Sequence, residues 1–130
     1  MHHTQLNPIQ IARFIISFSW IYHGLFPKLI HIAPLEKLMT ASLGFSDELS
    51  IWITRSAGVG EIIFGIILFI FYQSKLIVAL NIFALIMLLM FVCVFQPMVL
   101  IEAFNPVTTN LPIIAFSLIL LNNIKNKQND

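Results

Sequence analysis

The segment Leu76–Pro97 constrains the fold most, because Asn81 is its one strongly polar interior residue. A helix that crosses a membrane needs about 20 mainly apolar residues, and this segment has that length. The segments Pro8–Ile30 and Leu49–Phe71 have a similar character, whereas Pro106–Leu121 is apolar but short for a full crossing. Since backbone polar groups in lipid must bond within their own segment, we expect each of the four to form a helix.

Composition places the chain among membrane proteins. Hydrophobic residues make up 58% of the 130 residues and charged residues only 10%, against about 25% charged residues in a typical soluble domain. With so few polar groups the chain cannot cover its own surface, so lipid must be the solvent for much of it. We therefore predict an all-α fold, a four-transmembrane-helix antiparallel bundle formed by one domain over residues 1–130, with the lipid bilayer as a partner. The net charge of +1 gives no indication of a nucleic-acid partner.

The connections of this predicted bundle contain structure of their own. The segment Ile32–Phe45 between the first two spans is too apolar for a free loop, so we expect a short amphipathic helix on the membrane surface or against the bundle. Pro27 should kink or stop the first span near its end. The start of the fourth span, Asn105–Pro112, is expected to enter the bilayer as irregular backbone shielded by neighbouring helices. The expected helix N-caps are Asn7 for the first span and Ser46 or Asp47 for the second.

Lysine and arginine are distributed unevenly between the two ends of the predicted spans. Arg13, Lys75, Lys125 and Lys127 lie toward the end that also holds both termini, whereas Lys28 and Lys37 lie toward the other end, so the excess is modest. Since positively charged loops tend to stay in the cytoplasm, we predict a bacterial inner-membrane protein with both termini cytoplasmic. We expect no cleavable signal, because the segment Met1–Asn7 has no basic region and the apolar stretch that follows it is long.

Glu61 is the most informative charged residue, because it lies within the apolar segment Val59–Phe71. An ionised side chain at that depth costs about 2.5–3.5 kcal/mol on insertion scales, so we expect it to face a protein interior or a wet cavity. Helical spacing places small residues on the same face, which lets another helix approach closely. This face consists of Ala57, Gly58, Glu61 and Gly65. The predicted partner is a stripe on the first span, which consists of Arg13, Ser17, Trp20, Gly24 and Lys28.

The predicted threading brings polar groups to similar depths on the non-cytoplasmic side, where we expect them to converge on one cavity. Glu61 and His23 are the candidate catalytic residues, because histidine titrates close to neutral pH and can exchange protons with a carboxylate. The candidate ligand-binding residues are Arg13, Trp20, Lys28, Arg55, Glu102 and Asn105. A metal site needs three or four convergent ligands, and since no spacing motif of that kind supports one, we predict none.

The main candidates also have structural interpretations. Glu61 is then a buried carboxylate that is protonated, or paired with Arg13, Lys28 or Arg55, and that fixes the packing of helices. His23 would hydrogen-bond a neighbour near the membrane interface. Lys28 would extend its amine toward the membrane surface instead of binding an anionic group. Residue types and spacing leave both interpretations open.

Two short elements carry a family resemblance: His23-Gly24-Leu-Phe-Pro-Lys28, which closes the first span, and Gly58-Val-Gly-Glu61-Ile-Ile-Phe-Gly65 in the second. With Arg13 upstream and Asn105-Pro106 before the last span, they resemble the DoxX and DoxX-like family of small four-helix membrane proteins. An extra residue between His-Gly and Lys suits the DoxX-like branch better. The resemblance implies a four-helix bundle and a loose association with redox biology, since the family is named after a subunit of a thiosulfate:quinone oxidoreductase.

Two functional hypotheses follow. In the first, the protein is a redox-associated, quinone-linked membrane component that binds a lipophilic small molecule in the outer-side cavity, with a redox partner protein or as a homo-oligomer. Glu61 and His23 would exchange protons, while Lys28 and Arg55 would stabilise negative charge on a quinone oxygen. In the second, it is a non-enzymatic module for ligand binding, transport or assembly, and the polar cluster is structural. The single cysteine, Cys93, offers no thiol pair for electron transfer, which favours a separate redox partner or the second hypothesis.

Overall fold

A computed structural model describes residues 5–130, which form helices and connecting turns without a strand. The first residues of the segment Met1–Asn7, where we expect no cleavable signal, lie outside the described residues. In chain order the helices are α1 (Pro8–Leu25), the π-helix η1 (Phe26–Ile30), α2 (Pro34–Ala41), α3 (Asp47–Ile70), α4 (Lys75–Phe95), the 3-10 helix η2 (Pro97–Ile101) and α5 (Pro106–Asn129). The all-α prediction is confirmed for this part of the chain.

Each of the four long helices begins at a polar residue whose side chain accepts a hydrogen bond from a free backbone N–H of the first turn. Such caps satisfy donors that a helix start otherwise leaves unpaired. The predicted caps are confirmed, with Asn7 Oδ1 accepting from Ile9 N at 3.0 Å and Ser46 Oγ accepting from Leu49 N at 3.3 Å. The other two caps are Ser74 for α4 and Asn105 for α5.

Two boundaries involve proline. The regular helix α1 ends at Leu25, close to Pro27 as expected, but the chain continues as the π-turn of η1, in which His31 N donates to Phe26 O at 3.0 Å. The start of α5 is regular helix from Pro106 and contains Pro112 in its interior, so the expected irregular entry at Asn105–Pro112 was wrong. The Asn105 cap and a proline at the first helical position both favour a helix start there. α5 also continues to Asn129, which removes the predicted shortness of the fourth segment.

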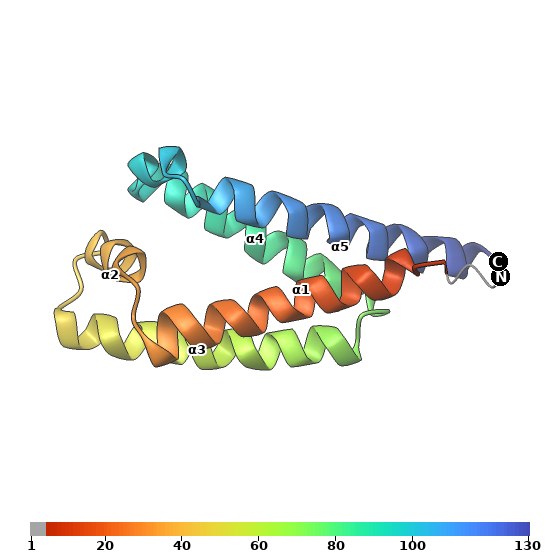
Figure 1. Cartoon of the computed structure of the whole chain (residues 1–130), viewed down its shortest axis with the longest axis horizontal. Helices are drawn as coiled ribbons and strands as arrows, with labels where there is room; N and C mark the ends of the chain where they lie inside the picture. The colour runs from red at the N-terminus through yellow and green to blue at the C-terminus, as the bar shows by residue number, and fades with distance from the viewer. Residues whose placement is uncertain (1–4) are drawn as a thin grey trace.

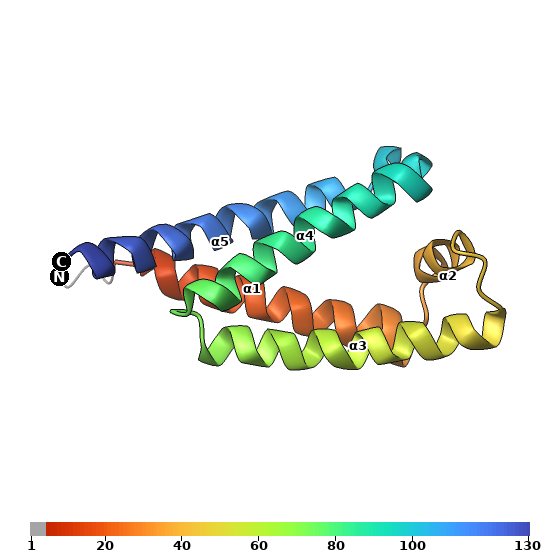
Figure 2. The ribbon, with the colours of Figure 1, turned by 180° about the vertical axis from the view of Figure 1, so that it is seen from behind.

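The helix α2 falls inside the segment Ile32–Phe45 that was expected to be amphipathic, and it packs against α3. The chain turns from α2 toward α3 at Gly44, whose φ of +79° is accessible to glycine without strain. The short helix η2 was not predicted. In Figures 1 and 2, α2 and η2 lie at the same end of the molecule.

The long helices are arranged in two closely packed pairs. α1 lies along α3 and α4 lies along α5, while α1 also contacts α5 (Figure 1). The start of α1 and the end of α5 lie together at one end, which we call the terminus end (Figure 2). The other end, with η1, α2, η2 and the start of α5, we call the cavity end. α3 and α4 are joined by a short turn near the terminus end and touch little beyond it.

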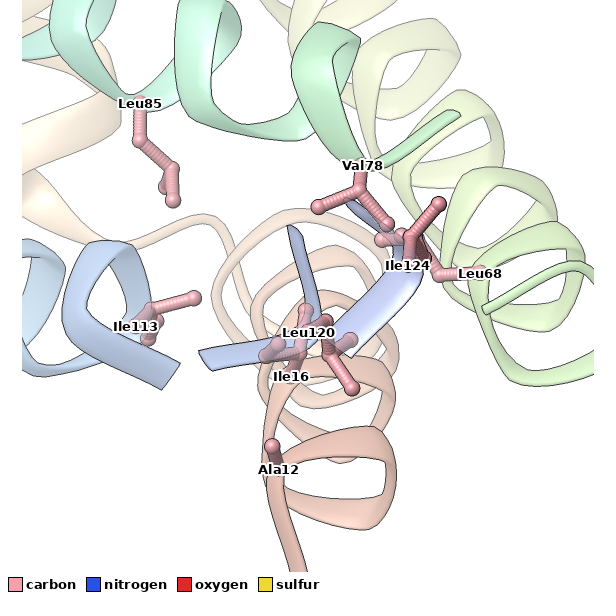
Figure 3. Close-up of a cluster of buried hydrophobic side chains, with 8 residues drawn as sticks. All are labelled: Ala12, Ile16, Leu68, Val78, Leu85, Ile113, Leu120 and Ile124. Carbon is pink, nitrogen blue, oxygen red and sulfur yellow. The ribbon is translucent and has the colours of Figure 1, made fainter. Parts of the chain in front are cut away.

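The hydrophobic core joins the four long helices (Figure 3). It consists of Ala12, Ile16, Leu68, Val78, Leu85, Ile113, Leu120 and Ile124. Large apolar side chains are also exposed on the outside of the bundle, such as Phe83 on α4 at 62%. Because contact between water and an apolar surface of this extent is unfavourable, lipid is the natural solvent for these faces.

Three helices in the described part of the chain are long and apolar enough to cross a membrane: α3, α4 and α5, with mean hydropathies of 1.8, 3.0 and 1.5. α1 is not among them. It has 18 residues and includes Gln10, Arg13 and His23. Three of the four predicted spans therefore have the required character by length and composition.

Candidate functional site

The site begins with the contact between α1 and α3, which glycines bring to backbone distance. A methyl group added at Gly58 would lie 2.6 Å from the backbone oxygen of Gly24, and one at Gly65 would lie 3.0 Å from that of Ser17. No side chain fits at either place, so the helices approach as closely as small residues allow. The predicted packing of the Glu61 face against the stripe of the first span is confirmed. This contact positions Glu61 beside the last turn of α1.

Lys28 lies in the π-helix η1, and its amine bridges two carboxylates. The Nζ atom is 2.8 Å from Glu36 Oε1 of α2 and 3.2 Å from Glu61 Oε1 of α3. Lys28 as a whole is only 8% exposed. A buried ammonium needs such partners, because leaving water without them is very costly. Three elements that are separate in the chain are therefore tied together by one cation.

A cavity of about 330 Å³ opens beside this ion pair at the cavity end. One part of its wall is polar and is formed by Ser19, His23, Lys28, Glu36, Glu61, Asn105, Thr109 and Asn110. The other part is apolar and includes Trp20, Leu35, Met39, Leu85, Leu88, Val92, Phe104 and Ile113. A mainly apolar cavity with a few convergent polar groups is typical of sites for small molecules.

Two polar atoms at this cavity are buried and have no hydrogen-bond partner within residues 5–130: Glu61 Oε2 and Asn110 Nδ2. Asn110 is only 4% exposed, so its amide has no ready access to bulk solvent. Native structures leave few such atoms unpaired, because each unmade bond costs about 1–3 kcal/mol. Glu61 Oε2 accepts a hydrogen bond when the carboxylate is ionised and donates one when this oxygen carries the proton, whereas Asn110 Nδ2 only donates. Both atoms belong to residues that line the cavity.

A separate hydrogen-bonded chain ties α1, α4 and α5 together beside the cavity. Trp20 Nε1 donates to Asn81 Oδ1 at 2.7 Å, Asn81 Nδ2 donates to Ser117 Oγ, and Ser117 Oγ donates to Ile113 O at 2.7 Å. Asn81 and Ser117 are both fully buried. Asn81 is therefore satisfied on both sides of its amide, unlike Asn110. This chain fixes the indole of Trp20, whose other face forms an edge contact with Phe64.

Five of the predicted site residues line the cavity: Trp20, His23, Lys28, Glu61 and Asn105. Their roles are not equivalent. The side chain of Asn105 is occupied by structure, since Oδ1 accepts from Val107 N and Thr108 N and Nδ2 donates to Glu102 O at 2.9 Å. His23 is an exposed residue of the cavity wall.

The structure does not bring Arg13, Arg55 or Glu102 to the cavity. Arg13 lies ten residues before His23, or about 15 Å along the helix, and its Nε donates to Phe69 O at 2.7 Å near the terminus end. Arg55 lies six residues from Glu61, a rotation of about 240° around α3, and is exposed on another face. Glu102 follows η2 and is exposed to the outside.

Four polar residues of the cavity were not predicted from the sequence: Ser19, Glu36, Thr109 and Asn110. Glu36 was read only as an acid on the outer side. Asn110 fell in a segment expected to be irregular, which hid its helical phase. Its spacing of seven residues from Ser117 places both on one face of a helix and was an available signal.

Comparison with known families gives one match. The sequence pattern of the DoxX-like family matches residues 17–118. The chain belongs to the DoxX-like family. Together with its apolar helices, membership supports an integral membrane protein in contact with lipid. Comparison with curated proteins and with solved structures gave no match.

The matched range relates directly to the site. It includes the α1–α3 contact, both carboxylate partners of Lys28, and the start of α5 up to Leu118. Arg13 precedes it, which separates that residue from the DoxX-like portion as well as from the cavity. The matched range covers the whole of α3 and α4 as well as the cavity walls, so family membership concerns most of the fold, while the chemistry of the site rests on its geometry.

Proposed function

We propose that this DoxX-like protein is a four-span antiparallel bundle in which α1 and η1 together form the additional span. Support comes from the length of this continuous helical segment, which follows α3 from the terminus end to the cavity end (Figure 1). The polar residues Gln10 and Arg13 lie near the start of α1, where a membrane interface tolerates them. The bundle is one domain, and its outer apolar faces contact lipid.

The cavity end faces the non-cytoplasmic side in this proposal, and both termini lie in the cytoplasm of a bacterial inner-membrane protein. Four of the seven lysines and arginines, Arg13, Lys75, Lys125 and Lys127, belong to the terminus end. Lys28, Lys37 and Arg55 lie toward the other end, where Lys28 is paired with two carboxylates. Such a bias of positive charge favours this orientation. Reporter proteins fused to the C-terminus test it: an enzyme active only in the cytoplasm should be active, and one active only outside should not.

The cavity binds a lipophilic small molecule that carries a polar group. The observation on which this depends is the pair of unpartnered buried atoms, Glu61 Oε2 and Asn110 Nδ2, beside an apolar wall. A ligand that bonds both removes their desolvation cost, and its apolar part fills the space beside Leu88 and Val92. The family's association with redox biology suggests a quinone-class ligand, with the Lys28 ammonium near its oxygen.

Redox chemistry then requires a partner. Cys93 is the single cysteine of the chain, so no thiol pair carries electrons within it. A redox partner protein or a second copy would supply or take the electrons. Glu61 and His23 would exchange protons with the bound molecule, because they line the same cavity. In this form the protein is a quinone-linked binding component.

Mass spectrometry of the purified protein tests the binding proposal. Protein extracted in mild detergent should carry a lipophilic compound that organic solvent releases. Glu61→Gln should lose that compound while its melting temperature shows that it is folded. Glu102→Gln is the matched control, because it makes the same chemical change at an exposed carboxylate outside the cavity. Full occupancy in Glu61→Gln would refute the proposal.

A structural role is the second candidate, and the bridging position of Lys28 favours it. Its amine joins η1 to α2 and α3, so the same charges hold the cavity end together. The protein would then act as a non-enzymatic module for transport or assembly. In that case Glu61→Gln should lower the melting temperature without any change in what co-purifies, which is the reverse of the binding result.

A further inference from the structure

A second hollow lies next to the main cavity, between α3 and α4. Its volume is about 410 Å³, and it shares Trp20, Ala57 and Glu61 with the main cavity. Its other lining residues are Gly60, Phe64, Leu80, Phe83 and Ala84. These add no charged group, so the hollow is an apolar groove that begins at the Glu61 carboxylate. We call it the α3/α4 groove.

We infer that the ligand is a single-chain amphiphile whose head lies in the main cavity and whose apolar chain lies in the α3/α4 groove. This inference rests on the proposed binding function and specifies its ligand. The head must carry both a hydrogen-bond donor and an acceptor, as the oxygen of a phenol or an alcohol does. The chain reaches the bilayer between α3 and α4.

The head chemistry follows from the two unpartnered atoms. Asn110 Nδ2 can only donate, so it requires an acceptor on the ligand. An ionised Glu61 has no proton to donate, so its oxygens can only accept hydrogen bonds. Oε1 faces Lys28 Nζ at 3.2 Å, which leaves Oε2 to accept from the ligand. A hydroxyl group supplies both an acceptor and a donor, whereas an ether lacks the donor and a hydrocarbon lacks both. The Lys28 amine beside them stabilises any negative charge that develops on that oxygen.

The position of the chain follows from the openness of the groove. A methyl group added at Gly60 would have no heavy atom within 4 Å, so this stretch of α3 is not covered by another helix. Leu80 and Phe83 on the facing side of α4 are 45% and 62% exposed. α3 and α4 also diverge from their connecting turn (Figure 2). A lipophilic chain can therefore enter sideways from the bilayer with no helix displaced.

The groove has another conceivable occupant, a helix of a second copy of the chain. The shared wall argues against it, because Glu61 and Trp20 connect the groove to a cavity that holds unpartnered polar atoms. A packed helix would close that passage and leave those atoms unpaired. An amphiphile fills both spaces at once.

The first experiment measures binding of 4-decylphenol and of its methyl ether to the full chain in lipid nanodiscs. The ether has the same chain but cannot donate, so the phenol should bind about tenfold more tightly. Equal affinity of the two would overturn the head chemistry. If neither probe nor any co-purified lipophile binds, the proposed function itself is wrong, which separates the two failures.

Asn110→Leu is the corresponding variant, and it should weaken the binding of both probes by about tenfold, because the oxygen of each accepts a hydrogen bond. Asn81→Leu is its matched control, since that amide is already bonded to Trp20 and Ser117. An unchanged affinity of Asn110→Leu for both probes would contradict the assigned donor. The comparison of the two probes on the wild-type chain remains decisive if either variant does not fold.

The second experiment tests the chain with Gly60→Leu, which adds a side chain to the groove at a position where an added Cβ has no heavy atom within 4 Å. Affinity for 4-decylphenol should fall about tenfold, while affinity for 4-ethylphenol, which ends within the main cavity, should not change. Equal losses for both probes, or none, would overturn the position of the chain. If Gly60→Leu instead converts an oligomer to a monomer in solution, the groove holds a second copy and the inference is wrong.

Discussion

Arg13 and Lys28 are cations at opposite ends of the same helix contact, and they are satisfied in different ways. Arg13 Nε donates to Phe69 O near the end of α3, and its guanidinium lies 4.0 Å and 4.3 Å from the ring centres of Phe69 and Tyr72. A second nitrogen of the guanidinium donates to Gln10 Oε1 at 3.2 Å, so Arg13 is held by a carbonyl, an amide and two rings with no carboxylate involved. Lys28 has two carboxylates, and one of them keeps an oxygen free.

This difference separates the structural end of the molecule from the functional end. Toward the terminus end most of the core cluster packs between the helices, and Arg13 bonds to Phe69 O, a carbonyl that the end of α3 leaves free. Two of the three buried side-chain atoms without a partner in residues 5–130 belong to cavity residues, and the third is Ser17 Oγ of α1. Unpaired atoms of this kind are uncommon in a folded interior and are characteristic of sites that bind something. Substitutions at the terminus end should therefore change stability alone, whereas substitutions at the cavity end should also change the occupancy of the cavity.

Lys28→Met should have the largest effect. It leaves Glu36 and Glu61 side by side without a counter-ion in a partly buried site, so we expect stability to fall by about 3–5 kcal/mol. Thermal unfolding in detergent measures the change. The double variant Lys28→Met with Glu61→Gln removes one of the stranded charges and should recover much of the loss. If the double variant melts no higher than the single one, the ion pair is not what holds the cavity end.

Gly58→Leu should rank second, at about 2–3 kcal/mol, because its side chain would collide with Gly24 O and with Lys28. Gly60→Leu is the matched control two residues away, where no atom lies within 4 Å. Both changes gain the same helix propensity, so that contribution cancels in the comparison. Equal melting temperatures for the two variants would contradict the close contact of α1 and α3.

Much of the fold could be predicted, because lipid allows few choices. Apolar length gives the helices, and the spacing of Gly58, Glu61 and Gly65 gives the face that meets α1. The sequence could not predict that the chain forms a π-turn at Pro27, since a proline near the end of a helix can end, kink or widen it. The regular start of α5 was missed because the segment Asn105–Pro112 was expected to be irregular. The Asn105 cap and Pro106 at the first helical position favour a regular start instead.

The site was predictable only in part, for a geometrical reason. Charged residues in an apolar chain attract attention, and Lys28 and Glu61 do meet. Arg55 was predicted to lie with them only because it has a similar depth in the membrane, although its helical phase places it on another side of α3. Asn110 is neutral and lies beside a proline, so nothing about its type marked it. Its importance comes from a missing partner, which is a property of the packed structure and not of the sequence.

Asn81→Leu and Asn110→Leu make the same change in two buried amides and should differ in outcome. Asn81 bonds to Trp20 and to Ser117, so its loss should lower stability by about 1–2 kcal/mol. Asn110 Nδ2 has no partner, so Asn110→Leu should leave the melting temperature nearly unchanged while reducing occupancy of the cavity. Thermal melting and mass spectrometry of the bound compound measure the two effects. A large drop in melting for Asn110→Leu would show a structural role for that amide.

Arg13→Lys should have the smallest effect and should act on stability alone. Lysine keeps the charge but cannot present the planar guanidinium that bonds Phe69 O and stacks on the rings of Phe69 and Tyr72, so we expect a loss of about 1 kcal/mol. Arg55→Lys, an exposed site on α3, is the control and should not change the melting temperature. Occupancy of the cavity should be the same in both variants, because neither residue lines it. If Arg13→Lys lowers occupancy at an unchanged melting temperature, the terminus end takes part in binding, and the division between a structural and a functional end is wrong.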